Sequence, residues 1–123
     1  MINNSEGRKE QSFQVRIASS FIERARGLLF CDPQPRGHLL YFPNCRAVHT
    51  FGMRYPLTVI FFDERNHVLR VVQKVNPNRI ITCLRARAVC ETTWRPETSD
   101  ELLDITQLEL ALARSLAQNR KQK

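Results

Sequence analysis

The sequence predicts an α+β protein: a mostly antiparallel β-sheet, or an open barrel-like arrangement, in a single domain with one or two short helices. Three observations lead to this prediction. The 123 residues are 42% hydrophobic and 25% charged, which is ordinary for one folded domain. The apolar residues fall mostly in short β-type runs that end at proline, asparagine or glycine. The two clearest runs, "LTVIFFD" and "VLRVVQKV", are separated only by "ERNH", as in a hairpin.

The N-terminal part of the chain predicts one strand and one short helix. Residues 1–11 are polar and are expected to form a tail. Apolar and polar residues alternate from Ser12 to Ala18, which predicts a half-buried strand. Ser20 and Glu23 have the spacing of a capping box, and Gly27 can end a helix in the left-handed conformation. A helix of about two turns is therefore expected between Ser20 and Gly27.

Three strands are predicted in the middle of the chain. His38–Phe42 is short, apolar and closed by Pro43. Leu57–Asp63 is rich in β-branched and aromatic residues, which predicts a strand buried on both faces. Val68–Val75 returns as the second arm of a hairpin, and Asn66 in the intervening turn is the residue best suited to a positive φ.

The C-terminal third is β-like at first and ambiguous later. Arg79–Thr93 has the pattern of a strand, and one of its faces carries Leu84, Ala86, Ala88 and Cys90. Capping residues and acids predict a short helix at Ser99–Leu103, and alternating leucines predict a strand at Leu108–Leu112. One continuous helix is the alternative. The β-rich domain is expected to span residues 12–113, followed by a basic tail at 114–123.

The net charge of +7, carried mainly by arginine, favours nucleic acid, acidic proteins or anionic lipid as partners. The arginines are scattered along the sequence, and no glycine–aromatic RNA-binding motif accompanies them. This pattern argues against nucleic acid, and a nucleic-acid-binding accessory protein is kept only as an alternative.

The sequence also predicts the compartment. No apolar run approaches the ~20 residues of a membrane helix. The polar N-terminus lacks the apolar core of a signal peptide. A cytoplasmic protein without a transmembrane segment is therefore expected.

Cysteine and histidine do not form a recognisable catalytic or metal-binding motif. Without an export signal, free thiols are expected at Cys31, Cys45, Cys83 and Cys90. No Cys-x-x-Cys pair is present, so neither a metal nor a cofactor is expected. Cys45 and His49 are four residues apart, which is ~13 Å in an extended chain and too far for a thiol–imidazole pair. A thiol- or histidine-dependent hydrolase remains an alternative function.

The order of the motifs carries more information than any single motif. "RARGLL" is followed by a strand ending in "YFPNC", then by "VHTFGMRYPLTVIFFD", an asparagine turn and "ARAVCE". Over roughly Phe13 to Leu112 this succession resembles a family of bacterial and archaeal proteins known as domain of unknown function 192. The residues that match its pattern are Arg26, Gly27, His49, Thr50, Met53, Pro56, Asp63 and Glu91.

The resemblance implies a compact, mostly β single domain and supplies no activity or ligand. Because some relatives lie among genes for pili or secretion, it also implies an accessory role in such a process. The chain departs from the family pattern at Thr58, where relatives usually carry aspartate. It departs again at "CETTWRP", which replaces a glycine-containing turn.

These observations favour a non-enzymatic binding or accessory module. The only dense polar cluster flanks the strongest predicted strand, and arginine with histidine suits an anionic ligand. The expected partner is an anionic small molecule or an acidic protein surface. The predicted ligand-binding residues are Arg46, His49, Thr50, Arg54 and Asp63.

Overall fold

The computed structural model describes residues 12–18, 20, 27–29, 32–96 and 103–121. The described residues form strands and one long helix. Their bounds are β1 (Gln14–Ile17), β2 (His38–Pro43), β3 (Ala47–His49), β4 (Leu57–Phe62), β5 (Val68–Val75), β6 (Ile80–Thr82), β7 (Ala88–Thr93) and α3 (Ile105–Lys121).

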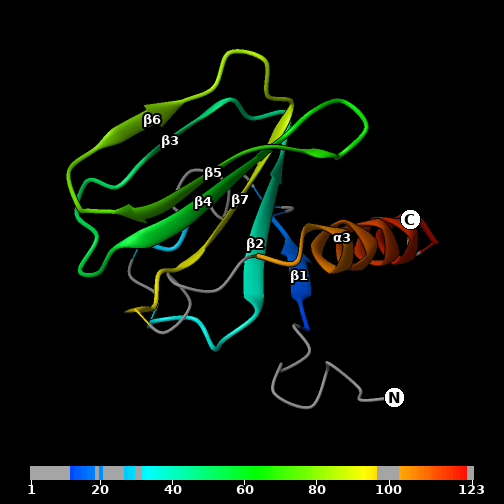
Figure 1. Cartoon of the computed structure of the whole chain (residues 1–123), viewed down its shortest axis with the longest axis horizontal. Coiled ribbons are helices and arrows are strands. Elements are labelled where there is room, and N and C mark those ends of the chain that lie inside the picture. The colour runs from blue at the N-terminus through cyan, green and yellow to red at the C-terminus, as the bar shows by residue number, and fades with distance from the viewer. Residues whose placement is uncertain (1–11, 19, 21–26, 30–31, 97–102, 122–123) are drawn as a thin grey trace, which may run out of the picture.

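The strands form an open five-stranded sheet and a separate two-stranded sheet. The larger sheet has the order β1-β2-β7-β4-β5, with β1 and β2 parallel and the other neighbours antiparallel. The smaller sheet pairs β3 with β6 antiparallel. This arrangement confirms the predicted α+β class with a mostly antiparallel sheet, and its open edges select the open-sheet form of that prediction (Figure 1).

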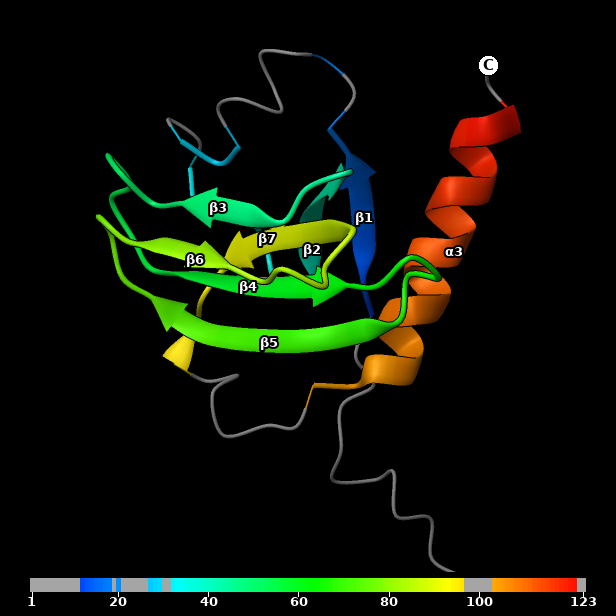
Figure 2. The same cartoon turned by 90° about the horizontal axis from the view of Figure 1, so that it is seen from above.

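The five-stranded sheet is covered on both faces. Leu57, Val59 and Phe61 of β4 belong to a core cluster that also contains Val48 of β3. Ile60 and Phe62, which point to the other face of β4, belong to a second core cluster that contains Leu108 of α3. The two-stranded sheet and α3 therefore lie on opposite sides of the larger sheet (Figures 1 and 2). Every residue of β4 is buried, which confirms the predicted strand buried on both faces.

Most of the other predicted strands are confirmed. β1, β2 and β5 lie within or nearly match their expected ranges, and Phe13, Val15 and Ile17 are half-buried as their alternation predicts. Asn66 has the expected positive φ, 62°. No helix in the described part of the chain is long and apolar enough to span a membrane. The tail at 1–11 and the helix expected after Ser20 fall on residues outside the described ranges.

The prediction of a strand at Leu108–Leu112 is wrong, and the continuous helix is closer to the structure. Leu108 and Leu112 are fully buried against the sheet, whereas Leu110 between them is 45% exposed. A spacing of four residues places two side chains on one helix face, so both leucines of α3 pack in the same core cluster. Residues 114–121, assigned to a tail, form the last turns of α3. The short helix expected at Ser99–Leu103 lies almost entirely outside the described residues.

The segment Arg79–Thr93 is two strands rather than one. A turn closed by the hydrogen bond that Ala86 N donates to Cys83 O, 3.0 Å, separates β6 from β7. Leu84 lies in this turn and is 82% exposed, so it does not share the buried face of Ala88 and Cys90. The short strand β3 was not predicted, because three residues give almost no periodic signal.

Candidate functional site

Thr50 is a buried structural residue. Its hydroxyl donates a hydrogen bond to Asn76 O at 2.7 Å and accepts one from Arg79 N at 2.9 Å. Its main-chain oxygen accepts from Asn78 N and Met53 N. The side chain is completely buried, so Thr50 joins the end of β3 to the chain between β5 and β6 and cannot touch a ligand directly.

His49 lies on the surface and is paired with an aromatic neighbour. Its Nδ1 accepts a hydrogen bond from Phe51 N at 3.3 Å, and its ring stacks on the Phe51 ring with the two ring centroids 5.4 Å apart. The Cys45 thiol instead donates to Ala47 O at 3.1 Å. No hydrogen bond joins Cys45 to His49 in the part of the chain that the structure describes, so the structure gives no support to a thiol–imidazole pair.

Asp63 organises the turn between β4 and β5. Its Oδ1 accepts hydrogen bonds from Arg65 N at 2.8 Å and His67 N at 2.9 Å. The His67 N–H bond is the main cause that lowers the pKa of this carboxyl below its ordinary value. Asp63 is therefore already engaged in the hairpin turn.

The five predicted site residues do not meet at one point. His49, Thr50 and Arg54 lie near the start of β4, next to the end of β5. Asp63 lies beyond the other end of β4, and six residues of strand span ~20 Å. Arg46 lies toward that end as well, because Cys45 N donates to Arg87 O and Arg87 N donates to Phe62 O. Arg46, His49 and Arg54 are exposed and could reach a ligand.

The outward side of the two-stranded sheet carries both polar and apolar side chains. Cross-strand partners point to the same side, and the pair Val48–Ile81 faces the core. The partners His49–Ile80 and Ala47–Thr82 therefore point outward, and all four of these residues are exposed. Phe51 and Leu84 extend this surface at its ends. We call it the β3–β6 face, made of Ala47, His49, Phe51, Ile80, Thr82 and Leu84.

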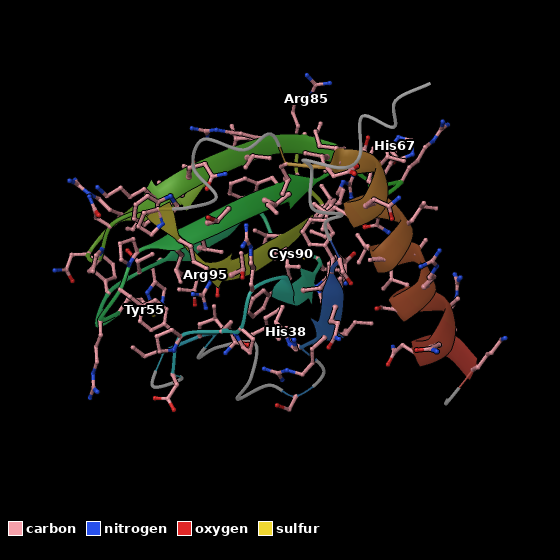
Figure 3. All side chains as sticks on the ribbon, turned by 60° about the horizontal axis from the view of Figure 1, so that its bottom comes forward. His38, Tyr55, His67, Arg85, Cys90 and Arg95 are labelled. Carbon is pink, nitrogen blue, oxygen red and sulfur yellow. The ribbon has the colours of Figure 1, made fainter. Side chains whose placement is uncertain are left out.

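Several arginines flank the strands of the β3–β6 face. Arg46 precedes β3, Arg79 precedes β6, and the Arg70 guanidinium donates to Thr82 O at 3.4 Å. Arg85 and Arg87 follow β6, and Arg85 points away from the rest of the protein in Figure 3. Within the described ranges, no carboxylate forms an ion pair with Arg46, Arg54, Arg79, Arg85 or Arg87. Their charges are available to a partner.

The charge of the protein is concentrated in this part of the chain. Residues 33–90 hold nine of the 19 basic residues but only two of the 12 acidic ones, Asp63 and Glu64. This segment alone has a net charge of +7, and the rest of the sequence is neutral. The arginines themselves are scattered along the sequence, whereas the acids are nearly absent from this segment. Counting acids along the chain would have revealed the segregation, and the pairing of β3 with β6 then brings several of the arginines together.

Glu91 is a carboxylate buried in the core, and it was not among the predicted site residues. It is 5% exposed on β7, and Leu28 N donates a hydrogen bond to its carboxylate. Burial raises its pKa from 4.5 to about 7, and the Leu28 bond only partly offsets this effect. Burial and the adjacent Glu91 also raise the pKa of the Cys90 thiol, which is therefore inert. In the sequence, the glutamate that follows the apolar residues of "ARAVCE" was the signal that could have identified this buried carboxylate.

The motifs that mark the family resemblance meet at the turn Gly27–Leu29. Gly27 has a φ of 60°, and a Cβ atom there would lie 2.8 Å from Glu91 Oε2. Gly52, in the loop after β3, also has a positive φ, and a Cβ there would lie 3.1 Å from Leu29 Cδ1. "RGLL", "HTFGM" and Glu91 are thus close-packed parts of one junction. Thr58, where relatives carry aspartate, is buried and donates to Gln73 Oε1 at 2.8 Å.

Comparisons with known proteins agree with the motif pattern. Residues 1–107 match the sequence model of DUF192, described as an uncharacterized ACR. The chain is 33% identical over 114 residues to the UPF0127 protein PH1112 of Pyrococcus horikoshii, covering 83% of this chain and 96% of that protein.

Two crystal structures share the fold. One is a protein of unknown function from Novosphingobium aromaticivorans, with a TM-score of 0.60 and 19% identity over 71% of this chain and 66% of the other. The second is a putative transcription regulator from Sinorhizobium meliloti, with a TM-score of 0.58 and 17% identity over 65% of this chain and 67% of the other. At these identities the likeness establishes the fold alone.

Proposed function

The chain belongs to the DUF192 family of uncharacterised proteins, and we propose that it is a binding module that recognises an anionic partner through the β3–β6 face and its arginines. The proposal retains the binding class favoured by the sequence and moves its centre to the two-stranded sheet. Arg46, His49 and Arg54 stay in the contact surface. Thr50 holds that surface in place, and Asp63 shapes the hairpin turn at the far end of β4.

The observation that carries the proposal is the segregation of charge. A surface salt bridge stabilises a fold by at most about 1 kcal/mol, so arginines without carboxylate partners contribute little to folding. Mutual repulsion between them costs stability. A cluster of arginines around one small sheet is therefore better explained by a partner than by the fold.

The chemistry of arginine suits this role. Its guanidinium stays charged at any physiological pH and offers paired N–H donors to carboxylate or phosphate oxygens. A surface of one charge sign also speeds the encounter with an oppositely charged partner, and salt weakens that effect. The binding should therefore weaken as ionic strength rises.

Fluorescence anisotropy with labelled poly-glutamate tests the proposal. The variant R46Q/R85Q, which removes as many charges as its control, should bind at least ten-fold more weakly than the parent chain at 50 mM NaCl. The control R114Q/R120Q removes charge from α3, away from the two-stranded sheet, and should change the affinity less than two-fold. Equal losses in the two variants would mean that the probe senses net charge alone, and the proposal would be wrong.

A further inference from the structure

We infer that the partner of the β3–β6 face is an acidic protein segment that also carries large apolar side chains. This inference rests on the proposed function and names the class of its partner. It depends on a second property of the same surface, its exposed apolar side chains, which charge alone does not explain.

Three large apolar side chains stand exposed on this small surface. Leu84 is 82% exposed, Ile80 is 63% exposed and Phe51 is 47% exposed. Ile80 is the cross-strand partner of His49, and His49 stacks on Phe51, so Ile80 and Phe51 lie on either side of His49. Leu84 lies two residues beyond Thr82 at the other end of β6. Exposed apolar side chains flanked by arginines have the composition of a protein interface, in which apolar groups are bordered by polar ones.

The type of basic residue supports the same conclusion. Residues 33–90 contain eight arginines and a single lysine. Arginine is enriched and lysine depleted in protein interfaces, because the planar guanidinium packs on apolar groups while it binds a carboxylate. A segment with alternating acidic and apolar residues would place its carboxylates on the arginines and its apolar side chains on Ile80 and Leu84.

Single-stranded nucleic acid fits this surface less well. Surfaces that bind it offer aromatic side chains on which successive bases stack. The outward aromatic residues here are His49 and Phe51, and each already covers a face of the other. The most exposed side chains are aliphatic, and they would remain in water beside a phosphate backbone.

Three fluorescein-labelled probes test the inference on the full chain. The first is a 15-residue peptide in which aspartate alternates with leucine or phenylalanine. The second has the same length and charge, with serine in place of every apolar residue. The third is a 15-nucleotide thymidine oligomer. The first peptide should bind at least ten-fold more tightly than either of the others.

Two variants separate the apolar contribution from the ionic one. I80S/L84S should lower the affinity for the first peptide to that of the serine peptide and leave the serine peptide unaffected. The control I105S/L110S alters exposed apolar residues of α3 and should change neither affinity. All four positions are exposed, so the melting temperature serves as the check on folding.

The outcomes distinguish this inference from the proposed function. Equal binding of the two peptides, lost in the arginine variant, would overturn the inference and leave the proposed function standing. Tighter binding of the oligonucleotide than of the first peptide would replace the protein partner by nucleic acid. Absence of binding by all three probes would overturn both proposals.

Discussion

Replacing Glu91 by glutamine should make the protein more stable above neutral pH. Glu91 is almost fully buried, with one hydrogen bond from Leu28 N, and its pKa is raised from 4.5 to about 7. The native state therefore holds a proton that the unfolded chain releases between these two pH values. Stability contributed by the neutral carboxyl is fully present below pH 4.5 and is lost as the pH rises through about 7.

The magnitude follows from the pKa difference. The interval from 4.5 to about 7 is about 2.5 pH units, and each unit corresponds to about 1.36 kcal/mol. Ionisation of Glu91 should thus cost about 3 kcal/mol of stability at pH 8.5. Glutamine has nearly the same shape, stays neutral and still accepts the Leu28 N–H bond, so E91Q avoids this loss.

Urea unfolding of the parent chain and E91Q at pH values from 4.5 to 8.5 measures the effect. The difference in the free energy of unfolding should be near zero at pH 4.5 and rise to about 3 kcal/mol in favour of E91Q at pH 8.5. The same subtraction cancels the titrating groups that do not interact with Glu91.

A flat difference between the parent chain and E91Q would refute this reasoning, because it would mean that Glu91 ionises alike in the folded and unfolded states. Lower stability of E91Q at pH 8.5 would refute it more strongly, since the carboxylate would then stabilise the fold. The 13C chemical shift of the Glu91 carboxyl gives an independent check, with an expected midpoint near pH 7.

Three further predictions test the packing. Thr50→Val leaves Asn76 O and Arg79 N without the hydroxyl that bonds them, and should lower the free energy of unfolding in urea by about 1–3 kcal/mol. Gly27→Ala forces a side chain into a positive φ and against Glu91, and should lower the melting temperature by several degrees; an unchanged value would show that the turn relaxes freely. Leu108→Ala should cost about 2–5 kcal/mol in the same urea assay, whereas Leu110→Ala should cost less than about 0.5 kcal/mol; equal losses would contradict the orientation of α3.

The candidate site was only partly predictable. Arg46, His49 and Arg54 were found because polar residues cluster before β4, and these three are exposed. Thr50 and Asp63 belong to the same polar cluster in sequence, but their side chains hold loops together. Sequence proximity reports that polar groups are near one another along the chain, and it does not report whether they face water or main-chain atoms.

The sequence by itself determined the local elements and the family. Period-two alternation, β-branched runs and the turn at Asn66 are properties of short segments, so β1, β2, β4 and β5 could be read directly. The tertiary structure alone decided which distant segments meet. It paired β3 with β6, which begins 31 residues after β3 ends. It also buried Glu91 under the Gly27–Leu29 turn. It also selected a helix for Ile105–Lys121, because burial against the sheet rewards the four-residue spacing of Leu108 and Leu112 over their alternation.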